Sequence, residues 1–263
     1  MLKGECLIIV PTYNNAGTLR DVISRILELD LPVLVVNDGS TDGTADILAE
    51  MTGRWASPGA SLRDPIRANA PGEAHLSVIT HRKNKGKGVA LKTGFREALR
   101  LGYRYAVTID ADGQHFPEDI PLLLSQAGKR TLVVGSRPVQ GADGGSSFAN
   151  RFSNFWFRLY TGCDLTDTQT GFRLYPLQDL PSLTLMSARY EAELSLLVFS
   201  AWKGLRLMPV PVRVAYPEDR VSHFRPTWDF LRISLLNTVL LLLALVYGWP
   251  RILFRRLLFR EKL

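Results

Sequence analysis

The sequence predicts an α/β fold in which a mainly parallel sheet is flanked by helices. Two observations support this prediction: short β-rich runs alternate with helical patterns through the first half of the chain, and polar motifs follow several of these runs. The predicted strands are Cys6–Val10, Val33–Val36, Leu76–Thr80, Tyr105–Ile109 and Thr131–Val134. The predicted helices are Thr18–Leu29, Thr44–Thr52, Gly88–Leu101 and Asp119–Ala127. Because ligands of such sheets bind beyond the carboxyl ends of the strands, we expect the functional site there.

Polar motifs leave the first two predicted strands, at Pro11–Asn15 and at Asn37–Thr44. Pro11 is expected to stiffen the first of these turns. A nucleotide needs an aromatic or backbone wall and a carboxylate that accepts hydrogen bonds, and Tyr13 and Asp38 are candidates for these two roles. Two ordinary turns that cap the following helices are the alternative interpretation.

A basic loop, His81–Gly88, follows the third predicted strand and contains Lys87. Its glycines and cations suit a loop that lies over a diphosphate. It is not a P-loop, because the Gly-Lys-Ser/Thr ending is absent. A solvated basic turn is the alternative.

The acidic stretch Asp110–Gln114 follows the fourth predicted strand. Alternate residues of an extended segment point to the same face, so Asp110 and Asp112 are expected to project together, with Gln114 following if the chain stays extended. Two carboxylates and an amide oxygen are hard donors that suit Mg²⁺ or Mn²⁺ better than zinc. Such a metal keeps positions that substrate phosphates fill. The alternative is a pair of strand-end caps or solvated turn residues.

The C-terminal part changes character, and we predict a boundary between residues 1–225 and residues 226–263. Phe230–Trp249 is almost wholly apolar, and twenty helical residues span about 30 Å, enough to cross a hydrocarbon core. After Pro250, arginines recur at helical spacing opposite Leu and Phe, as in a helix that lies in a membrane interface. A buried core helix with a solvated tail is the alternative interpretation.

Composition limits the possible partners and the compartment. The chain has 263 residues, 46% of them hydrophobic, and a formal net charge of +7. No basic helix interleaved with base-stacking aromatic residues is visible, so phosphorylated small molecules and an anionic membrane surface fit this charge better than nucleic acid. Two cysteines argue against a disulfide framework and for a reducing compartment, and no secretory signal pattern is visible.

Taken together, five motifs resemble glycosyltransferase family 2, in the branch that contains dolichyl-phosphate mannose synthase and bacterial polyprenyl-phosphate sugar transferases. They occur in the order of the family, over about Cys6 to Ser222: Pro-Thr-Tyr-Asn, Asn-Asp-Gly-Ser-Thr-Asp-Gly-Thr, Asn-Lys-Gly-Lys-Gly-x-Ala-Leu, Asp-Ala-Asp-Gly-Gln-His and Asp-Thr-Gln-Thr-Gly-Phe-Arg. The resemblance implies a GT-A fold, which is Rossmann-like, together with a nucleotide-sugar donor, a divalent metal and inversion at the anomeric carbon.

The resemblance also implies roles for individual donor-site residues. Asp110, Asp112 and Gln114 would hold the metal against the donor diphosphate. Pro11, Tyr13 and Asp38 would line the nucleotide pocket. Asn15 stands where these enzymes often have Glu, and Asn37 where they often have Asp, so the choice between guanine and uracil stays open.

On the acceptor side, Arg137 and Arg151 would bind the acceptor phosphate. Arg220, in a motif whose usual Ser-Lys ending is interrupted by His223, would close over the phosphates. Asp167 would orient the acceptor or act as a base.

Two further segments have alternative interpretations. Phe148–Tyr160 carries aromatic residues at helical spacing, which indicates either an amphipathic helix at a membrane or a core helix. Glu191 and Glu193 precede an apolar helix and are interpreted as cap and dipole residues.

The leading hypothesis is a membrane-attached inverting glycosyltransferase that moves a sugar from a nucleotide-diphosphate sugar to a polyprenyl phosphate. A transferase acting on a sugar or lipid hydroxyl is the near alternative, and it would need a base such as Asp167 or Glu191. A non-catalytic nucleotide-binding membrane module is the remaining one.

Overall fold

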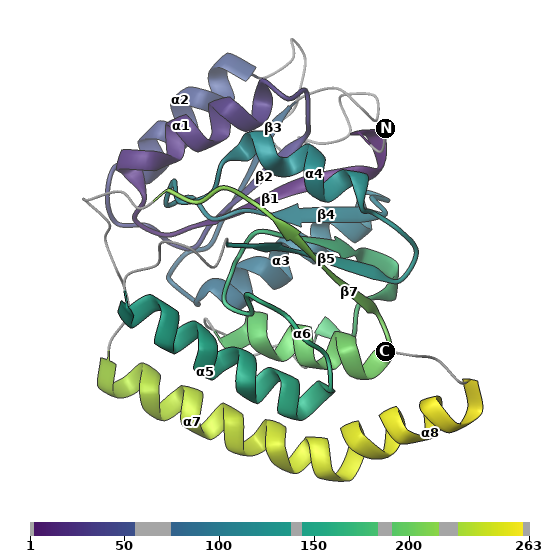
Figure 1. The fold of residues 1–263 in the computed structure, drawn as a ribbon. Helices are drawn as coiled ribbons and strands as arrows, with labels where there is room; N and C mark the ends of the chain where they lie inside the picture. Colours follow the sequence, from purple (N-terminus) through teal and green to yellow (C-terminus); the bar gives the residue numbers. More distant parts are fainter. Residues whose placement is uncertain (1–2, 56–74, 138–143, 184–190, 216–225, 260–263) are drawn as a thin grey trace.

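The computed structural model describes residues 3–55, 75–137, 144–183, 191–215 and 226–259. At its centre is a seven-stranded sheet in the order β3-β2-β1-β4-β6-β5-β7 (Figure 1). The strands are β1 (Cys6–Thr12), β2 (Val33–Asn37), β3 (Leu76–Thr80), β4 (Tyr105–Thr108), β5 (Thr131–Ser136), β6 (Arg173–Pro176) and β7 (Arg206–Pro211). All neighbouring strands are parallel except that β6 runs antiparallel to β4 and β5. The predicted α/β class and its mainly parallel sheet are therefore confirmed.

Helices cover both faces of this sheet. The helices are α1 (Ala16–Leu27), α2 (Thr44–Trp55), α3 (Lys87–Arg100), α4 (Ile120–Ser125), α5 (Gly144–Thr161), α6 (Glu191–Lys203), α7 (Pro226–Leu243) and α8 (Trp249–Phe259). Side chains of β1 alternate between two buried clusters: Leu7 and Ile9 pack with α3 and α6, whereas Ile8 and Val10 pack with α1. This alternation follows from the two-residue period of a strand that is buried on both faces.

The strands β6 and β7 were not predicted from the sequence. Strand β6 begins with Arg173, a cation that is fully buried, and β7 contains Pro209 and Pro211. Proline lacks a backbone N–H, and β7 tolerates it because this strand lies at the edge of the sheet. A charged residue in β6 and two prolines in β7 do not fit the sequence pattern of a strand, so neither strand was predicted. Tertiary packing stabilises both strands.

The expectation that Pro11 lies in a turn is wrong, because Pro11 belongs to β1 and pairs with Val36 of β2. The register of β1 with β4 runs only from Cys6 to Ile9. Strand β4 has therefore left the ladder before Pro11, and the missing N–H costs no hydrogen bond.

The C-terminal helices lie along the domain beneath α5 and α6 (Figure 1). A five-residue π-helix, Ala244–Gly248, joins α7 to α8. Trp202 of α6 is fully buried against this joint, where a Cβ on Gly248 would overlap the indole ring. Trp249 Nε1 donates to the Leu159 carbonyl at 3.1 Å, and Arg251 Nε donates to the Trp202 carbonyl at 3.0 Å. These contacts fix the C-terminal helices to α5 and α6.

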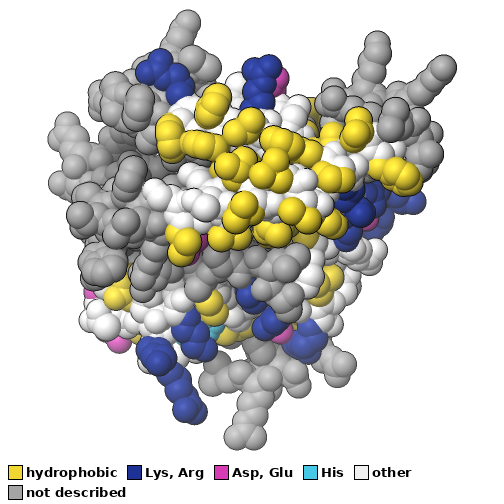
Figure 2. Space-filling model, turned by 90° about the horizontal axis from the view of Figure 1, so that it is seen from below, with side chains coloured by type: hydrophobic (Ala, Val, Ile, Leu, Met, Phe, Trp, Pro, Cys, Tyr) yellow, Lys and Arg dark blue, Asp and Glu magenta, His cyan; other side chains and the backbone are white. Residues whose placement is uncertain are grey.

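The outer side of this helical layer is apolar. Figure 2 shows hydrophobic side chains gathered over the face that is seen from below. The exposed apolar residues of α5, the π-helix and its flanking helices are Phe152, Phe155, Leu159, Leu235, Val239, Leu242, Leu243, Leu245, Val246, Tyr247, Trp249, Leu253 and Phe254. The segment Ser234–Phe254 is long and apolar enough to cross a membrane, and 17% of its most apolar window is buried. A patch of this kind marks a surface that contacts a partner or a membrane.

Candidate active site

Candidate site residues follow strands β1, β2, β4 and β5, and others lie at the start of α3, on α5 and in the loop between α5 and β6. The chain after β4 does not stay extended as predicted, because Ala111 and Asp112 form a turn. Asp112 Oδ1 accepts a hydrogen bond from the backbone N–H of Gln114 at 3.0 Å, and Thr18 Oγ1 donates to the Ala111 carbonyl. Asp112 and Gln114 are therefore positioned by a turn and not by the alternation of a strand.

Asp110 lies in a cluster of charged residues. Lys87, the first residue of α3, places its Nζ 2.8 Å from Asp110 Oδ1 and 2.9 Å from Oδ2. The same Nζ lies 2.9 Å from Oε2 of Glu193, whose side chain is 7% exposed. A Cβ on Gly171 would overlap the Asp110 carboxylate, so only glycine permits this close packing. One ammonium group is thus shared by two carboxylates.

Electrostatics in this cluster hold Lys87 charged. Burial alone would lower the pKa of Lys87, but the attraction of Asp110 and Glu193 is stronger and raises it above its usual range. Burial would raise the pKa of Asp110, and Lys87 more than offsets this and lowers it. For Glu193, burial prevails over Lys87, and its pKa is raised.

The cluster adds a role to Glu193, which was interpreted as a cap or dipole residue. Both Glu191 and Glu193 lie in the first turn of α6, as expected, and the side chain of Glu193 also pairs with Lys87. Glu193 Oε1 is buried without a hydrogen-bond partner among the described residues. The local sequence does not predict the pairing of Glu193 with Lys87, because the two residues meet only when α3 and α6 pack on the same face of the sheet.

Asp38 anchors the basic loop. Its carboxylate accepts hydrogen bonds from the backbone N–H groups of Lys85 at 3.0 Å and Gly86 at 2.7 Å, and it lies 2.6 Å from His81 Nδ1. Its side chain is 4% exposed. The Asp38 carboxylate, predicted to line the nucleotide pocket, is thus occupied in holding the loop that ends at Lys87.

Tyr13 and Asn15 form the turn after β1. Asn15 Oδ1 accepts hydrogen bonds from the Tyr13 N–H and from Thr12 Oγ1, both at 3.2 Å. The next loop packs against this turn, because Ser40 Oγ accepts a hydrogen bond from the Asn14 N–H at 3.0 Å. The two motifs predicted to bind the nucleotide are therefore brought together.

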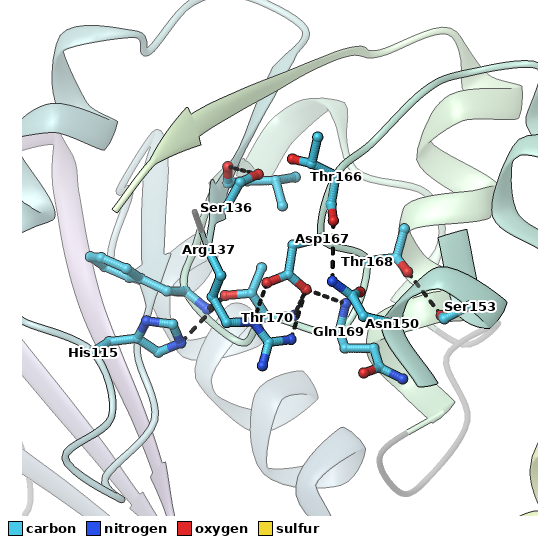
Figure 3. A network of polar contacts seen from close by, with 12 residues as sticks. His115, Ser136, Arg137, Asn150, Ser153, Thr166, Asp167, Thr168, Gln169 and Thr170 are labelled. Carbon is cyan, nitrogen blue, oxygen red and sulfur yellow. Dashed lines mark hydrogen bonds and ion pairs between the residues drawn. The ribbon is translucent and has the colours of Figure 1, made fainter. Parts of the chain in front are cut away.

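Arg137 and Asp167 form a second ion pair, at the end of β5 (Figure 3). Arg137 Nε lies 2.5 Å from Asp167 Oδ2, and its terminal nitrogen donates to Oδ1 at 3.0 Å. Asp167 Oδ1 also accepts the N–H groups of Gln169 and Thr170, and the Asp167 side chain is fully buried. This geometry favours a positioning role for Asp167 over that of a base, because its carboxylate is buried and hydrogen-bonded to Arg137.

Arg151 lies on the part of α5 that packs against the loop preceding Asp167. Asn150 and Asn154 donate to the Thr166 carbonyl at 3.2 and 2.8 Å, and Ser153 and Thr168 share a hydrogen bond (Figure 3). Arg151 itself is exposed. Arg220 and its motif lie outside the described residues.

His115 connects this network to the turn after β4. Its Nε2 lies 3.4 Å from Thr170 Oγ1, and its backbone forms a bridge with Val214. Burial lowers its pKa to about 4, so the ring is neutral near pH 7. A neutral His115 links the acidic turn to the loop that carries Asp167.

The sequence is similar to known glycosyltransferases. The model of the family described as "Glycosyl transferase family 2" matches residues 7–176. An undecaprenyl-phosphate mannosyltransferase from Micrococcus luteus is 34% identical over 217 residues, which cover 78% of this chain and 82% of the relative. A UDP-N-acetylglucosamine–dolichyl-phosphate N-acetylglucosaminyltransferase from Methanococcus voltae is 29% identical over 221 residues, covering 80% of this chain and 86% of the relative.

A solved structure has the same fold. Glucosyl-3-phosphoglycerate synthase from Mycobacterium tuberculosis, in complex with Mn²⁺, UDP and glucosyl-3-phosphoglycerate, matches with a TM-score of 0.60 and 20% identity. The match covers 91% of this chain and 79% of that one. This likeness confirms the GT-A fold that the sequence resemblance implied.

Proposed function

The chain belongs to glycosyl transferase family 2, and we propose that it moves a sugar from a nucleotide-diphosphate sugar to a polyprenyl phosphate. One observation carries the assignment: the chain matches most of the length of two relatives whose names both specify a polyprenyl-type phosphate acceptor. The two relatives transfer different sugars, so the proposal names the class of donor and leaves the sugar open.

The acceptor site centres on Arg137. Asp167 holds the guanidinium group through two hydrogen bonds, which fixes its direction before a substrate arrives. Arg151, on the neighbouring helix α5, is the second ligand that we assign to the acceptor phosphate. A phosphate monoester is already anionic near neutral pH, so it needs no strong base to become a nucleophile. The buried position of Asp167 fits this chemistry.

The proposed reaction is a single displacement that inverts the anomeric carbon. An acceptor phosphate oxygen forms a bond to this carbon while the bond to the donor diphosphate breaks, and the bonding electrons leave with the nucleoside diphosphate. Arg137 and Arg151 align the attacking oxygen. Tyr13 and the adjoining turns bind the nucleotide, and Lys87, at the start of α3, lies where a helix favours phosphate.

A divalent metal fits the donor set of the acidic turn. We assign Mg²⁺ or Mn²⁺ to Asp110, Asp112 and Gln114, where the metal would stabilise the leaving diphosphate as a Lewis acid. Over the residues that the structure describes, no group of three or more His, Cys, Asp or Glu side chains is arranged to hold a metal. The donor set itself fits magnesium chemistry, in which one or two carboxylates are completed by water and substrate phosphates.

The apolar face of α5, α7 and α8 is the surface that we assign to the membrane. A polyprenyl phosphate resides in a bilayer, and α5, the helix that carries Arg151, contributes exposed apolar side chains to this face. A cavity of about 550 Å³ between the end of α5 and α8, lined by Leu159, Leu245 and Leu253 among others, gives an isoprenoid chain apolar surroundings. Nucleotide sugars are cytoplasmic, so we place the catalytic half of the chain on the cytoplasmic side.

The full-length protein, purified in detergent, should be assayed with a panel of nucleotide sugars and polyprenyl phosphate. The expected result is nucleoside diphosphate release that depends on the lipid phosphate, with a matching glycolipid product. The control is the same lipid with a free hydroxyl in place of the phosphate. Transfer to the hydroxyl lipid alone would support the near alternative, and no transfer with any donor would support a non-catalytic module.

A further inference from the structure

The ammonium group of Lys87 is paired with the carboxylate of Asp110, the first carboxylate assigned to the metal. Both oxygens of Asp110 lie within 2.9 Å of Lys87 Nζ. A divalent cation and an ammonium group repel each other, so the two cannot share this carboxylate at low cost. In the ligand-free protein Lys87 therefore competes with the metal.

We propose that Lys87 is an internal counter-cation that makes the metal bind together with the donor diphosphate instead of before it. The inference rests on the proposed function and goes beyond it by assigning an order of binding and a residue that enforces it. The acidic turn supplies two carboxylates, Asp110 and Asp112, so the remaining positions of a bound metal are left for water and substrate phosphates. The diphosphate completes the metal coordination and offers Lys87 a new anionic partner at the N-terminus of α3.

Glu193 is the partner that Lys87 retains when it leaves Asp110. Its Oε2 already lies 2.9 Å from Nζ. Its Oε1 is buried and, within the described part of the chain, has no hydrogen-bond partner, so it can accept a second bond from the ammonium group. Because the Glu193 carboxylate pairs with the Lys87 ammonium group, we assign Glu193 as a positioning residue that acts through Lys87.

This arrangement has a thermodynamic consequence. If the diphosphate removes Lys87 from Asp110, it strengthens metal binding, and the metal must strengthen diphosphate binding by the same factor. The quantity to measure is therefore the ratio of Mn²⁺ affinities with and without a nucleoside diphosphate. It requires no acceptor and no turnover.

The test measures Mn²⁺ binding to the full-length protein by the loss of the free-ion electron paramagnetic resonance signal, alone and with UDP or GDP, after subtraction of the loss that the same nucleotide causes without protein. We expect a nucleoside diphosphate to tighten Mn²⁺ binding at least tenfold. Lys87→Met keeps the apolar stem and removes the charge, so it should tighten binding of Mn²⁺ alone about tenfold and reduce the ratio. Lys85→Met is the control, because it removes the same charge from an exposed position in the same loop.

Glu193→Gln is the second variant and should act in the opposite direction. Lys87 then has Asp110 as its one anionic partner in the cluster, so Mn²⁺ alone should bind severalfold more weakly while the nucleotide still restores binding. Equal Mn²⁺ affinities with and without nucleotide, or equal effects of Lys87→Met and Lys85→Met, would overturn the inference and leave the proposed function standing. The absence of Mn²⁺ binding under every condition would instead contradict the metal assignment itself.

Discussion

At the scale of single residues, the assignment of a metal can be tested at the acidic turn after β4. Replacing Asp112 with Asn keeps an oxygen that can accept the Gln114 N–H, so the turn should persist. The substitution removes one negative metal ligand, which is worth several kcal/mol of transition-state stabilisation. We expect turnover to fall about 10³-fold while the melting temperature stays within a few degrees. Full activity in this variant, or in excess chelator, would contradict the metal assignment.

The acceptor arginines give a prediction that separates binding from chemistry. Arg137→Ala and Arg151→Ala should each raise the KM for polyprenyl phosphate about tenfold to hundredfold, because a charge-assisted hydrogen bond is worth roughly 1.5–3 kcal/mol. Binding of the nucleotide donor, measured by calorimetry, should change little. An equal loss of donor affinity would place these residues in the donor site.

A positioning role of Asp167 can be distinguished from that of a catalytic base by which kinetic parameters change when Asp167 is replaced. Asp167→Asn retains an oxygen for the N–H groups of Gln169 and Thr170 but weakens the hold on Arg137. We expect the KM for the lipid phosphate to rise and the shape of the pH–rate profile to stay the same. A large fall in kcat with loss of the acidic limb of that profile would instead identify Asp167 as a base.

At the scale of secondary-structure elements, regular patterns were predictable and long-range pairings were not. Strands β1 to β5 and helices α1 to α4 carry apolar runs or apolar periodicity of their own, so the sequence predicts them to within a few residues. Strand β6 contains a buried arginine, and β7 contains two prolines. These two segments form strands because they pair with neighbouring strands of the sheet. The same limit applies to the site. The acidic turn and the basic loop are local motifs, whereas Glu193 joins Lys87 through tertiary packing.

The apolar helical layer gives a prediction at the same scale. Phe155 and Val246 are 61% and 81% exposed on the face assigned to the membrane, so glutamate at either position should not disturb the core. Burying such a side chain is worth about 1.5–3 kcal/mol. We therefore expect each variant to weaken co-sedimentation with anionic lipid vesicles about tenfold or more. Leu122→Glu, on helix α4, is the control, because Leu122 is an exposed apolar residue on another helix. An effect of equal size there would refute the assignment.

At the scale of the whole molecule, charge limits how the C-terminal helices meet a membrane. A single crossing by Phe230–Trp249 would carry the arginines after Pro250 to the side opposite the catalytic half, against the positive-inside tendency. The contacts of Trp249 and Arg251 with α5 and α6 instead hold this end of the segment against the catalytic half. We expect Lys262→Cys to resist an impermeant thiol reagent added to intact cells and to react after permeabilisation. Ready labelling from outside would demonstrate a crossing.

The packing of Trp202 against Gly248 has a consequence for the proposed reaction at a bilayer, because it joins the C-terminal helices to the α/β domain. Leu240 and Ala244 are buried in the same cluster as Trp202, so the helices that we assign to the membrane are continuous with the core of the α/β domain. A catalytic domain on a flexible linker samples many heights above a membrane, because the spread of a random-coil linker grows with its length. With the proposed membrane face, the fold itself would set the height and tilt of Arg137 relative to the lipid surface. The acceptor phosphate must therefore rise from the bilayer to a fixed level, which makes the reach of the lipid headgroup itself a determinant of substrate choice.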